Sequence, residues 1–183
     1  DKTGLVGWEI KGKTVGIIGL GKIGTRTAEL FHAFGANILA QSRSLHENAA
    51  NYIEQVSQEE LLRRSDIVVL HCPLNGSTRG MINAEKLAMM KPSALLVNVA
   101  RGPVVVEKDL VNALENGVIA GAALDVFENE PPLDPASPVL HAPNCLVTPH
   151  VAFATQQSMS LRAEIVFENL AQWMDGHPIN VIL

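Results

Sequence analysis

The chain has 183 residues, of which 47% are hydrophobic and 18% are charged, and its formal net charge is −5. This composition is that of a globular protein with enough apolar residues for one well-filled domain and little left for a second. The acidic balance disfavours nucleic acid and anionic membrane surfaces as partners, and no apolar run approaches the roughly 18 residues of a spanning helix.

The two cysteines indicate the redox compartment of the protein, and the first residue indicates whether the chain is a fragment. Cys72 and Cys145 both lie in apolar contexts and do not resemble a disulfide framework. We therefore expect reduced thiols and a cytoplasmic protein. Because the chain begins with Asp1 rather than Met, we also expect it to be a fragment of a longer protein.

Short apolar runs alternate with helical patterns from one end of the chain to the other. The runs are rich in Val, Ile and Leu and lack strict alternation, which is typical of parallel strands covered on both faces. Strand–helix–strand repetition of this length predicts an α/β fold with a doubly wound parallel sheet. The predicted strands span residues 14–19, 37–41, 53–56, 67–71, 94–99, 119–127 and 145–148.

The helices have recognisable ends. Ser57 with Glu60 three residues later predicts a capping box. Asn83 is expected to cap the next helix, and Gly117 is expected to end the helix after it in a left-handed conformation.

The last predicted helix, roughly residues 155–174, has apolar residues on two opposite faces. A surface helix needs only one apolar stripe, so we expect another element to cover the second face, although a pair of exposed aliphatic side chains is the simpler alternative. One face carries Met159, Ala163, Val166, Leu170 and Trp173, and the other carries Leu161 and Ile165.

A glycine-rich turn joins the first predicted strand to the first helix. Gly19, Gly21 and Gly24 follow the G-x-G-x-x-G pattern, in which the glycines allow a tight turn, close approach of a pyrophosphate, and close packing of helix on strand. The helix N-terminus then offers free N–H groups to phosphates. The pattern predicts a Rossmann dinucleotide site, with a turn that binds no ligand as the alternative. Its expected contacts are Gly19, Leu20, Gly21, Lys22, Ile23 and Gly24.

The same helix has an apolar stripe of its own. Ile23, Thr27, Leu30 or Phe31, and Phe34 recur at helical spacing. We expect this stripe to face the sheet.

The stretch after the second strand lacks the acid that dinucleotide folds usually carry there. An Asp or Glu roughly twenty residues after the last glycine normally holds the ribose of NAD, but residues 30–46 contain no acid and include Ser42, Arg43 and Ser44. Arg43 can pair with a 2′-phosphate and the two hydroxyls can donate to it. This predicts NADP as the preferred cofactor over NAD. The alternative is an NAD site with Arg43 stacked on adenine or turned to solvent.

Three ionisable residues follow other predicted strands, at the edge where open α/β sheets bind ligands. Arg101 can hold a carboxylate, His150 can move a proton near neutral pH, and Glu130 can pair with that histidine. The alternative is that Arg101 only stabilises a loop and that Glu130 is a solvent-exposed acid without a catalytic role. Two sets of residues could suggest zinc: His141, Cys145 and His150, and the pair His71 and Cys72. We expect no metal site, because the first set lies partly along an apolar strand that turns neighbouring side chains to opposite faces.

Taken together, the motifs resemble the D-isomer-specific 2-hydroxyacid dehydrogenase family over nearly the whole chain. The resemblance implies the strand order 3-2-1-4-5-6-7 and catalytic roles for Arg101, Glu130 and His150. It also implies that the nicotinamide half of the cofactor meets Asp125, His150, Cys72, Pro73, Thr78, Val99 and Ala100. The motifs are "GKTVGIIGLGKIG", "SDIVVLHCPLNGSTRGMIN", "LLVNVARGPVVVE", "AGAALDVFENEPP", "NCLVTPHVA" and "GHPINVI".

The implied reaction is hydride exchange between nicotinamide and C2 of a small D-2-hydroxy or 2-keto acid, in a homodimer formed through the cofactor domain. Members of the family carry a second domain, most of it N-terminal to the cofactor domain, and this chain begins just before the cofactor domain. We therefore expect residues 1–183 to be the dinucleotide-binding domain, able to bind cofactor with little turnover alone. Some relatives are dinucleotide-sensing corepressors, so a binding protein is the alternative.

Overall fold

The computed structural model describes residues 7–43, 49–130 and 134–181. They belong to two compact units, of which the first ends at Pro149 and the second begins at His150. None of the described helices is long and apolar enough to cross a membrane.

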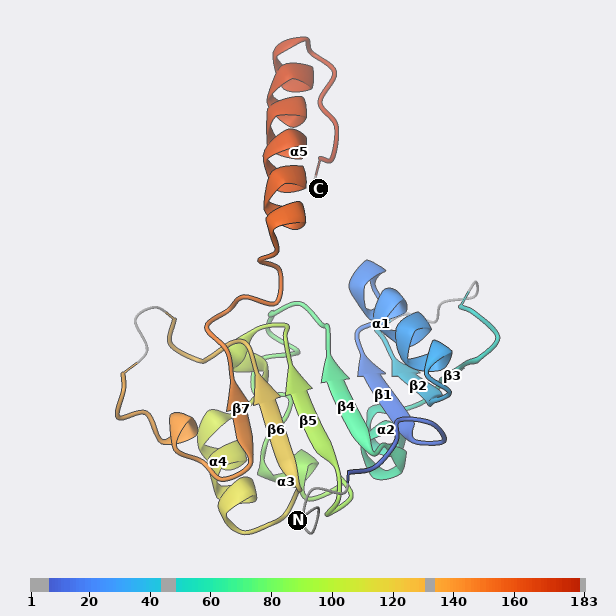
Figure 1. The fold of residues 1–183 in the computed structure, drawn as a ribbon, viewed down its shortest axis with the longest axis vertical. Coiled ribbons are helices and arrows are strands. Elements are labelled where there is room, and N and C mark those ends of the chain that lie inside the picture. Colours follow the sequence, from blue (N-terminus) through green and yellow to red (C-terminus); the bar gives the residue numbers. More distant parts are fainter. Residues whose placement is uncertain (1–6, 44–48, 131–133, 182–183) are drawn as a thin grey trace. The chain divides into compact units, whose positions relative to one another are not determined.

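The first unit is built on a parallel sheet whose strands all point to the same edge (Figure 1). Its order is β3-β2-β1-β4-β5-β6-β7, which confirms the expected fold and strand order. β6 is shorter than expected, because the chain leaves the sheet at Asp125. The strands are β1 (Thr14–Ile18), β2 (Asn37–Gln41), β3 (Ile53–Gln55), β4 (Ile67–Leu70), β5 (Leu95–Asn98), β6 (Gly121–Leu124) and β7 (Cys145–Val147).

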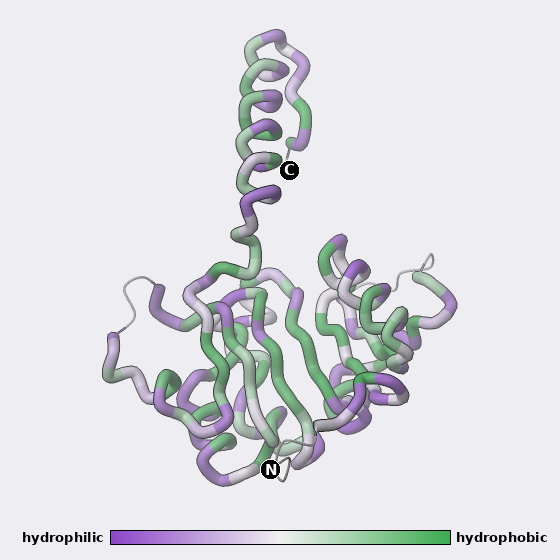
Figure 2. Tube along the Cα trace, in the orientation of Figure 1, coloured by the Kyte–Doolittle hydropathy of each residue, from purple (hydrophilic) through white to green (hydrophobic). Residues whose placement is uncertain are grey.

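Two apolar clusters lie on the two faces of this sheet. The larger joins side chains of α2 (Gln58–Arg64), α3 (Ala84–Leu87) and α4 (Glu107–Glu115) to those of the strands. The smaller packs α1 (Lys22–Ala33) on β1, β2 and β4. Two short 3-10 turns, η1 (Gly102–Val104) and η2 (Pro138–Leu140), complete the unit. The hydropathy colouring shows the strands as the most hydrophobic part of the fold (Figure 2).

The helix ends agree closely with their sequence signals. Asn83 Oδ1 accepts a hydrogen bond from Lys86 N at 3.1 Å, and Gly117 has a φ of 65° just after α4. Ser57 Oγ accepts from Glu60 N at 3.2 Å. The Glu60 carboxylate binds Arg64 at 2.6 Å, however, so the structure shows only the serine half of the expected capping box.

The expected orientation of α1 is right for Thr27, whose hydroxyl lies beside His71, and for Phe31, but it is wrong for the other apolar residues of the stripe. Its buried residues are Gly24 and Ala28, whereas Ile23, Leu30 and Phe34 are exposed. Phe31 is the one aromatic of the stripe that packs against the core. The reason is the close approach of the helix to the glycine turn, which small residues allow and large ones prevent.

The sheet is not covered equally along its width. β4 is buried at all four positions, but burial alternates along β5 and β7. Val97, Ala123 and Leu146 are paired in register and therefore share one face, and Leu146 is 68% exposed. Figure 1 shows no helix of the first unit in front of β5, β6 and β7. Val97 packs partly against the smaller apolar cluster, so among the described residues of this unit the second face is open toward β7 rather than at β5.

The second unit is dominated by α5 (Gln156–Met174). Thr155 and Ser158 form a reciprocal capping box at its start, and Asn180 Nδ2 donates to Asn169 Oδ1 at 2.8 Å. No residue of α5 is buried. Within this unit, therefore, both of its expected apolar faces are exposed.

Candidate functional site

The glycine turn after β1 is shaped by close backbone contacts. Gly19 has a φ of 102°, and a Cβ there would lie 2.7 Å from Cys72 N. A Cβ on Gly24 would collide with the carbonyl oxygen of Gly19. A Cβ on Gly21, by contrast, would meet nothing within 4 Å. The first and third glycines are therefore required by the fold, and the second leaves open space beside the backbone that a ligand can enter.

The start of α1 completes this cradle. Gly21 is its N-cap, no side chain caps the helix, and its first turn contains no acid. The amides of Lys22, Ile23 and Gly24 belong to the first turn, where backbone N–H groups have no partner within the helix. With the positive end of the helix dipole they suit a diphosphate.

A cavity of about 540 Å³ opens beside the turn, at the carboxyl edge of the sheet. Eight of the residues expected to bind cofactor line it: Gly19, Leu20, Gly21, Ser42, Arg43, Cys72, Pro73 and Thr78. Ser44 lies outside the described residues. The cavity thus brings the glycine turn, the end of β2 and the segment after β4 together in one concave site of the size that holds small ligands.

The segment after β4 forms a well-ordered wall. Thr78 Oγ1 donates to Pro73 O at 2.6 Å, and Asn75 Oδ1 accepts from Ser77 N at 2.9 Å. Burial raises the pKa of the Cys72 thiol, so it remains protonated at neutral pH. Cys72 is therefore a small neutral wall residue rather than a nucleophile.

Several lining residues were missed from the sequence. His71 directly follows β4, and its Nε2 lies 2.9 Å from Thr27 Oγ1 of α1. Burial lowers the pKa of His71, so the ring is neutral near pH 7. Its place beside Cys72 was a usable signal. Gln58 carried none, because the same stretch was interpreted as a helix start. The others are Ile18, Gln41, Asn75, Ser77 and Met81.

Arg101 lies on a loop that the side chain of Asn98 holds by hydrogen bonds. Asn98 is 1% exposed; its Nδ2 donates to Arg101 O and its Oδ1 accepts from Ala100 N, both at 3.1 Å. The Arg101 guanidinium donates to Ala100 O at 2.6 Å. Val99 and Ala100 lie in this same turn, outside the lining of the cavity described above.

The Arg101 and Glu130 loops meet through Phe127. Gly102 packs so tightly on the Phe127 carbonyl that a Cβ would overlap it. Glu130 Oε1 accepts from Phe127 N at 2.6 Å. Both loops therefore contact the backbone of the same residue, Phe127, in the segment after β6.

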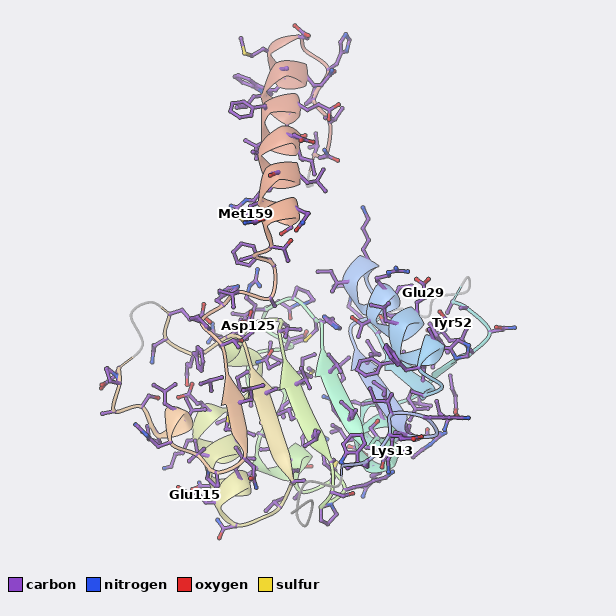
Figure 3. The ribbon with its side chains drawn as sticks, viewed as in Figure 1. Lys13, Glu29, Tyr52, Glu115, Asp125 and Met159 are labelled. Atoms are coloured by element: carbon purple, nitrogen blue, oxygen red, sulfur yellow. The ribbon has the colours of Figure 1, made fainter. Side chains whose placement is uncertain are left out.

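Asp125 and His150 are placed differently. Asp125 is buried at the carboxyl end of β6 (Figure 3), where its Oδ1 accepts from Thr148 Oγ1 at 2.5 Å. His150 is the first residue of the second unit and has a φ of 54°. Its ring packs edge-on against the Phe153 ring, with 5.9 Å between the ring centroids. Within the described ranges, no group of three His, Cys, Asp or Glu side chains could hold a metal ion.

A parallel sheet in this order, with a glycine cradle, a helix N-terminus and a cavity at its carboxyl edge, defines a dinucleotide-binding domain. The sequence profile of the "D-isomer specific 2-hydroxyacid dehydrogenase, NAD binding domain" matches residues 1–152. The chain belongs to this family.

Relatives agree with this assignment. The chain is 40% identical to the hydroxypyruvate reductase of Blautia hydrogenotrophica over 95% of its length, and 43% identical to the glyoxylate reductase of Aeropyrum pernix over 97%. The NAD-complexed D-isomer specific 2-hydroxyacid dehydrogenase of Lactobacillus delbrueckii ssp. bulgaricus superposes with a TM-score of 0.89 at 33% identity, over 99% of this chain and 58% of that one. The chain spans 54% of the length of each reductase.

Proposed function

We propose that the chain is the cofactor domain of an NAD(P)-dependent oxidoreductase that interconverts a small 2-keto acid and its D-2-hydroxy acid. The observation that carries the proposal is the cavity that joins the glycine cradle to the ends of β2 and β4. The names of the two reductases support a substrate as small as glyoxylate or hydroxypyruvate. Activity of the full-length protein across a panel of keto acids tests it. No activity with any keto acid of the panel, together with tight cofactor binding, would overturn the proposal in favour of a dinucleotide sensor.

The chain's own residues take distinct roles in this proposal. The nicotinamide ring supplies or accepts the hydride when the cofactor is bound. Arg101 binds the substrate carboxylate, because a guanidinium pairs with it through two donors. His150 gives a proton to the forming alkoxide, and Glu130 stabilises the imidazolium. Asp125 would lie near the nicotinamide carboxamide, the place that the family resemblance implies for this acid.

We infer that NADP(H) is preferred over NAD(H). Ser42 and Arg43 line the cavity directly after β2, where an acid would repel a 2′-phosphate. Ser42→Asp is expected to shift preference toward NADH, and Arg43→Ala is expected to weaken NADPH far more than NADH. Dissociation constants for both cofactors, measured by titration of the reduced nicotinamide fluorescence, test this. Equal losses for the two cofactors from Arg43→Ala would overturn it.

We further propose that residues 1–183 are one domain of a two-domain enzyme and turn over poorly alone. The two exposed apolar faces of α5 and the exposed Leu146 on β7 support this, because apolar surface of that extent is usually covered. The test compares reduction of glyoxylate and hydroxypyruvate by this chain and by the full-length protein. An ordinary enzymatic rate from the chain alone would contradict the proposal.

We propose, finally, a cytoplasmic homodimer. Cys72 and Cys145 are free thiols, which suits a reducing compartment. Ile23, Leu30 and Phe34 lie outward on α1 at helical spacing. A second copy of the chain packed on this stripe would bury it.

A further inference from the structure

Gln58 carries an unpaired buried polar group at the wall of the cofactor cavity. The residue lines the cavity, and its Nε2 is buried without a hydrogen-bond partner. Among the described residues no other buried side-chain nitrogen or oxygen is left unpaired in this way. Buried donors are nearly always paired, since an unmade hydrogen bond costs free energy. An unpaired amide in a ligand cavity therefore points to a ligand.

The neighbours of Gln58 are committed elsewhere. Ser57 Oγ accepts from Glu60 N at 3.2 Å, and Lys86 Nζ donates to Glu59 Oε1 at 3.0 Å. The helix that begins at Gln58 is anchored by Leu61 and Leu62, which are fully buried. The carboxamide of Gln58 is thus held on a fixed element and is not used by the caps and ion pairs around it.

The order of the strands indicates which part of a dinucleotide Gln58 meets. The glycine turn follows β1, Ser42 and Arg43 follow β2, and Gln58 comes shortly after β3. Since β1, β2 and β3 are successive neighbours in the sheet, these positions run outward across it. With the diphosphate at the glycine turn and the ribose at the end of β2, the adenine base comes next.

We propose that the Gln58 carboxamide recognises the adenine base of the cofactor. This rests on the proposed function. Nε2 donates to the ring nitrogen beside the 6-amino group, and Oε1 accepts from that amino group. A neutral amide with a donor and an acceptor side by side matches this edge of adenine. A phosphate, which offers only acceptors and a negative charge, is matched by Arg43 instead.

Pairing with the base satisfies a donor that has no partner in the free protein. An ordinary protein hydrogen bond adds little because it replaces another bond. Nε2 of Gln58 has no such bond to give up, so the gain on binding is larger than usual.

The test is a double-mutant cycle of the protein and the cofactor. Wild type and Gln58→Leu are titrated with NADPH and with its 1,N6-ethenoadenine analogue, in which the amino edge is blocked. Gln58→Leu is expected to weaken NADPH about tenfold, which corresponds to about 1.4 kcal/mol, and to leave the analogue nearly unchanged. The ratio of the NADPH and NADH dissociation constants stays the same. Urea unfolding checks the fold, and the variant is expected to be at least as stable as wild type, because leucine removes an unpaired buried donor.

Gln41→Leu is the matched control. Gln41 also lines the cavity but stands at the end of β2, so its loss should leave the preference for adenine over ethenoadenine intact. Equal weakening of NADPH and of its ethenoadenine analogue by Gln58→Leu would overturn the inference. A loss confined to NADPH, with NADH unaffected, would overturn it too and assign the amide to the 2′-phosphate. If wild type bound neither NADPH nor NADH, the proposed function itself would fail.

Discussion

The side chain of Asn98 holds the loop that carries Arg101 through two hydrogen bonds to its backbone. Nδ2 donates to Arg101 O and Oδ1 accepts from Ala100 N, both at 3.1 Å. Since Asn98 is buried, a variant that removes its amide takes the bond from Ala100 N and leaves Arg101 O with only the bond from Val104 N at 3.2 Å. The loop that presents Arg101 therefore depends on one buried residue at the end of β5.

Asn98→Ala is expected to lower the free energy of unfolding by about 1–3 kcal/mol, the usual cost of buried polar groups left unpaired. Urea denaturation measures it. Asn116→Ala is the control, because Asn116 makes a single exposed bond to Asn112 O at 2.8 Å and should change stability by about 0.5 kcal/mol or less. Similar losses from both variants would show that the Asn98 bonds do not hold the loop.

The second and third glycines of the turn are expected to respond differently to alanine. Gly24→Ala collides with the Gly19 carbonyl and should destabilise the fold by about 1–3 kcal/mol. Gly21→Ala meets only open space, so stability should change by less than about 1 kcal/mol. Its dinucleotide affinity, however, should fall about tenfold or more, because the methyl group occupies space meant for the diphosphate.

Thermal unfolding and titration with NADPH, run on both glycine variants, separate these two effects. Gly21→Ala that bound cofactor as tightly as wild type would show that the diphosphate does not lie against the turn.

The pH dependence of stability is expected to report on His71. Its pKa is lowered by burial from an ordinary 6.5, so the folded state keeps the ring neutral while the unfolded chain takes up a proton below 6.5. Protonation therefore favours unfolding. The stability that the folded protein gains from keeping His71 neutral is fully present above pH 6.5. It is lost as pH falls toward the lower pKa of the folded state.

His71→Gln removes this titration and keeps a hydrogen-bonding group near Thr27 Oγ1. The drop in unfolding free energy between about pH 7.5 and about pH 5.5 should be smaller in this variant than in wild type. Thr27→Val is the matched variant, because it removes the 2.9 Å bond and leaves the imidazole in place. It should lower stability without flattening the pH slope. An unchanged slope in His71→Gln would refute the assignment.

Local signals in the sequence predicted the fold well. Gly19, Gly21 and Gly24 marked the turn, Asn83 and Gly117 marked helix ends, and the strand order followed from the family resemblance. These features depend on residues close together in the chain or on motifs of fixed spacing. The cavity then gathers eight of the residues that were expected to bind cofactor.

The features that were missed depend on what packs against what. The spacing of the apolar residues of α1 predicts that Ile23 and Phe34 face the sheet, but the helix lies so close to Gly19 that its buried residues are Gly24 and Ala28. Gln58 was passed over because its neighbours Ser57 and Glu60 signal a helix start. No pattern within either segment reveals the element across from it.

The outward stripe on α1 leads to a prediction about assembly. Ile23 is 70% exposed and Phe34 is 66% exposed, a cluster of apolar surface that favours association. Leu30→Glu places a charge in the middle of the stripe, where burial without a partner is costly. Sedimentation of the wild-type chain is expected to show dimers, and the variant should shift to monomers with its unfolding transition retained.

Leu146→Glu, which alters an equally apolar and exposed position on β7, should leave the dimer intact. Dimers that persist in Leu30→Glu, or dissociate equally in Leu146→Glu, would place the contact on another surface.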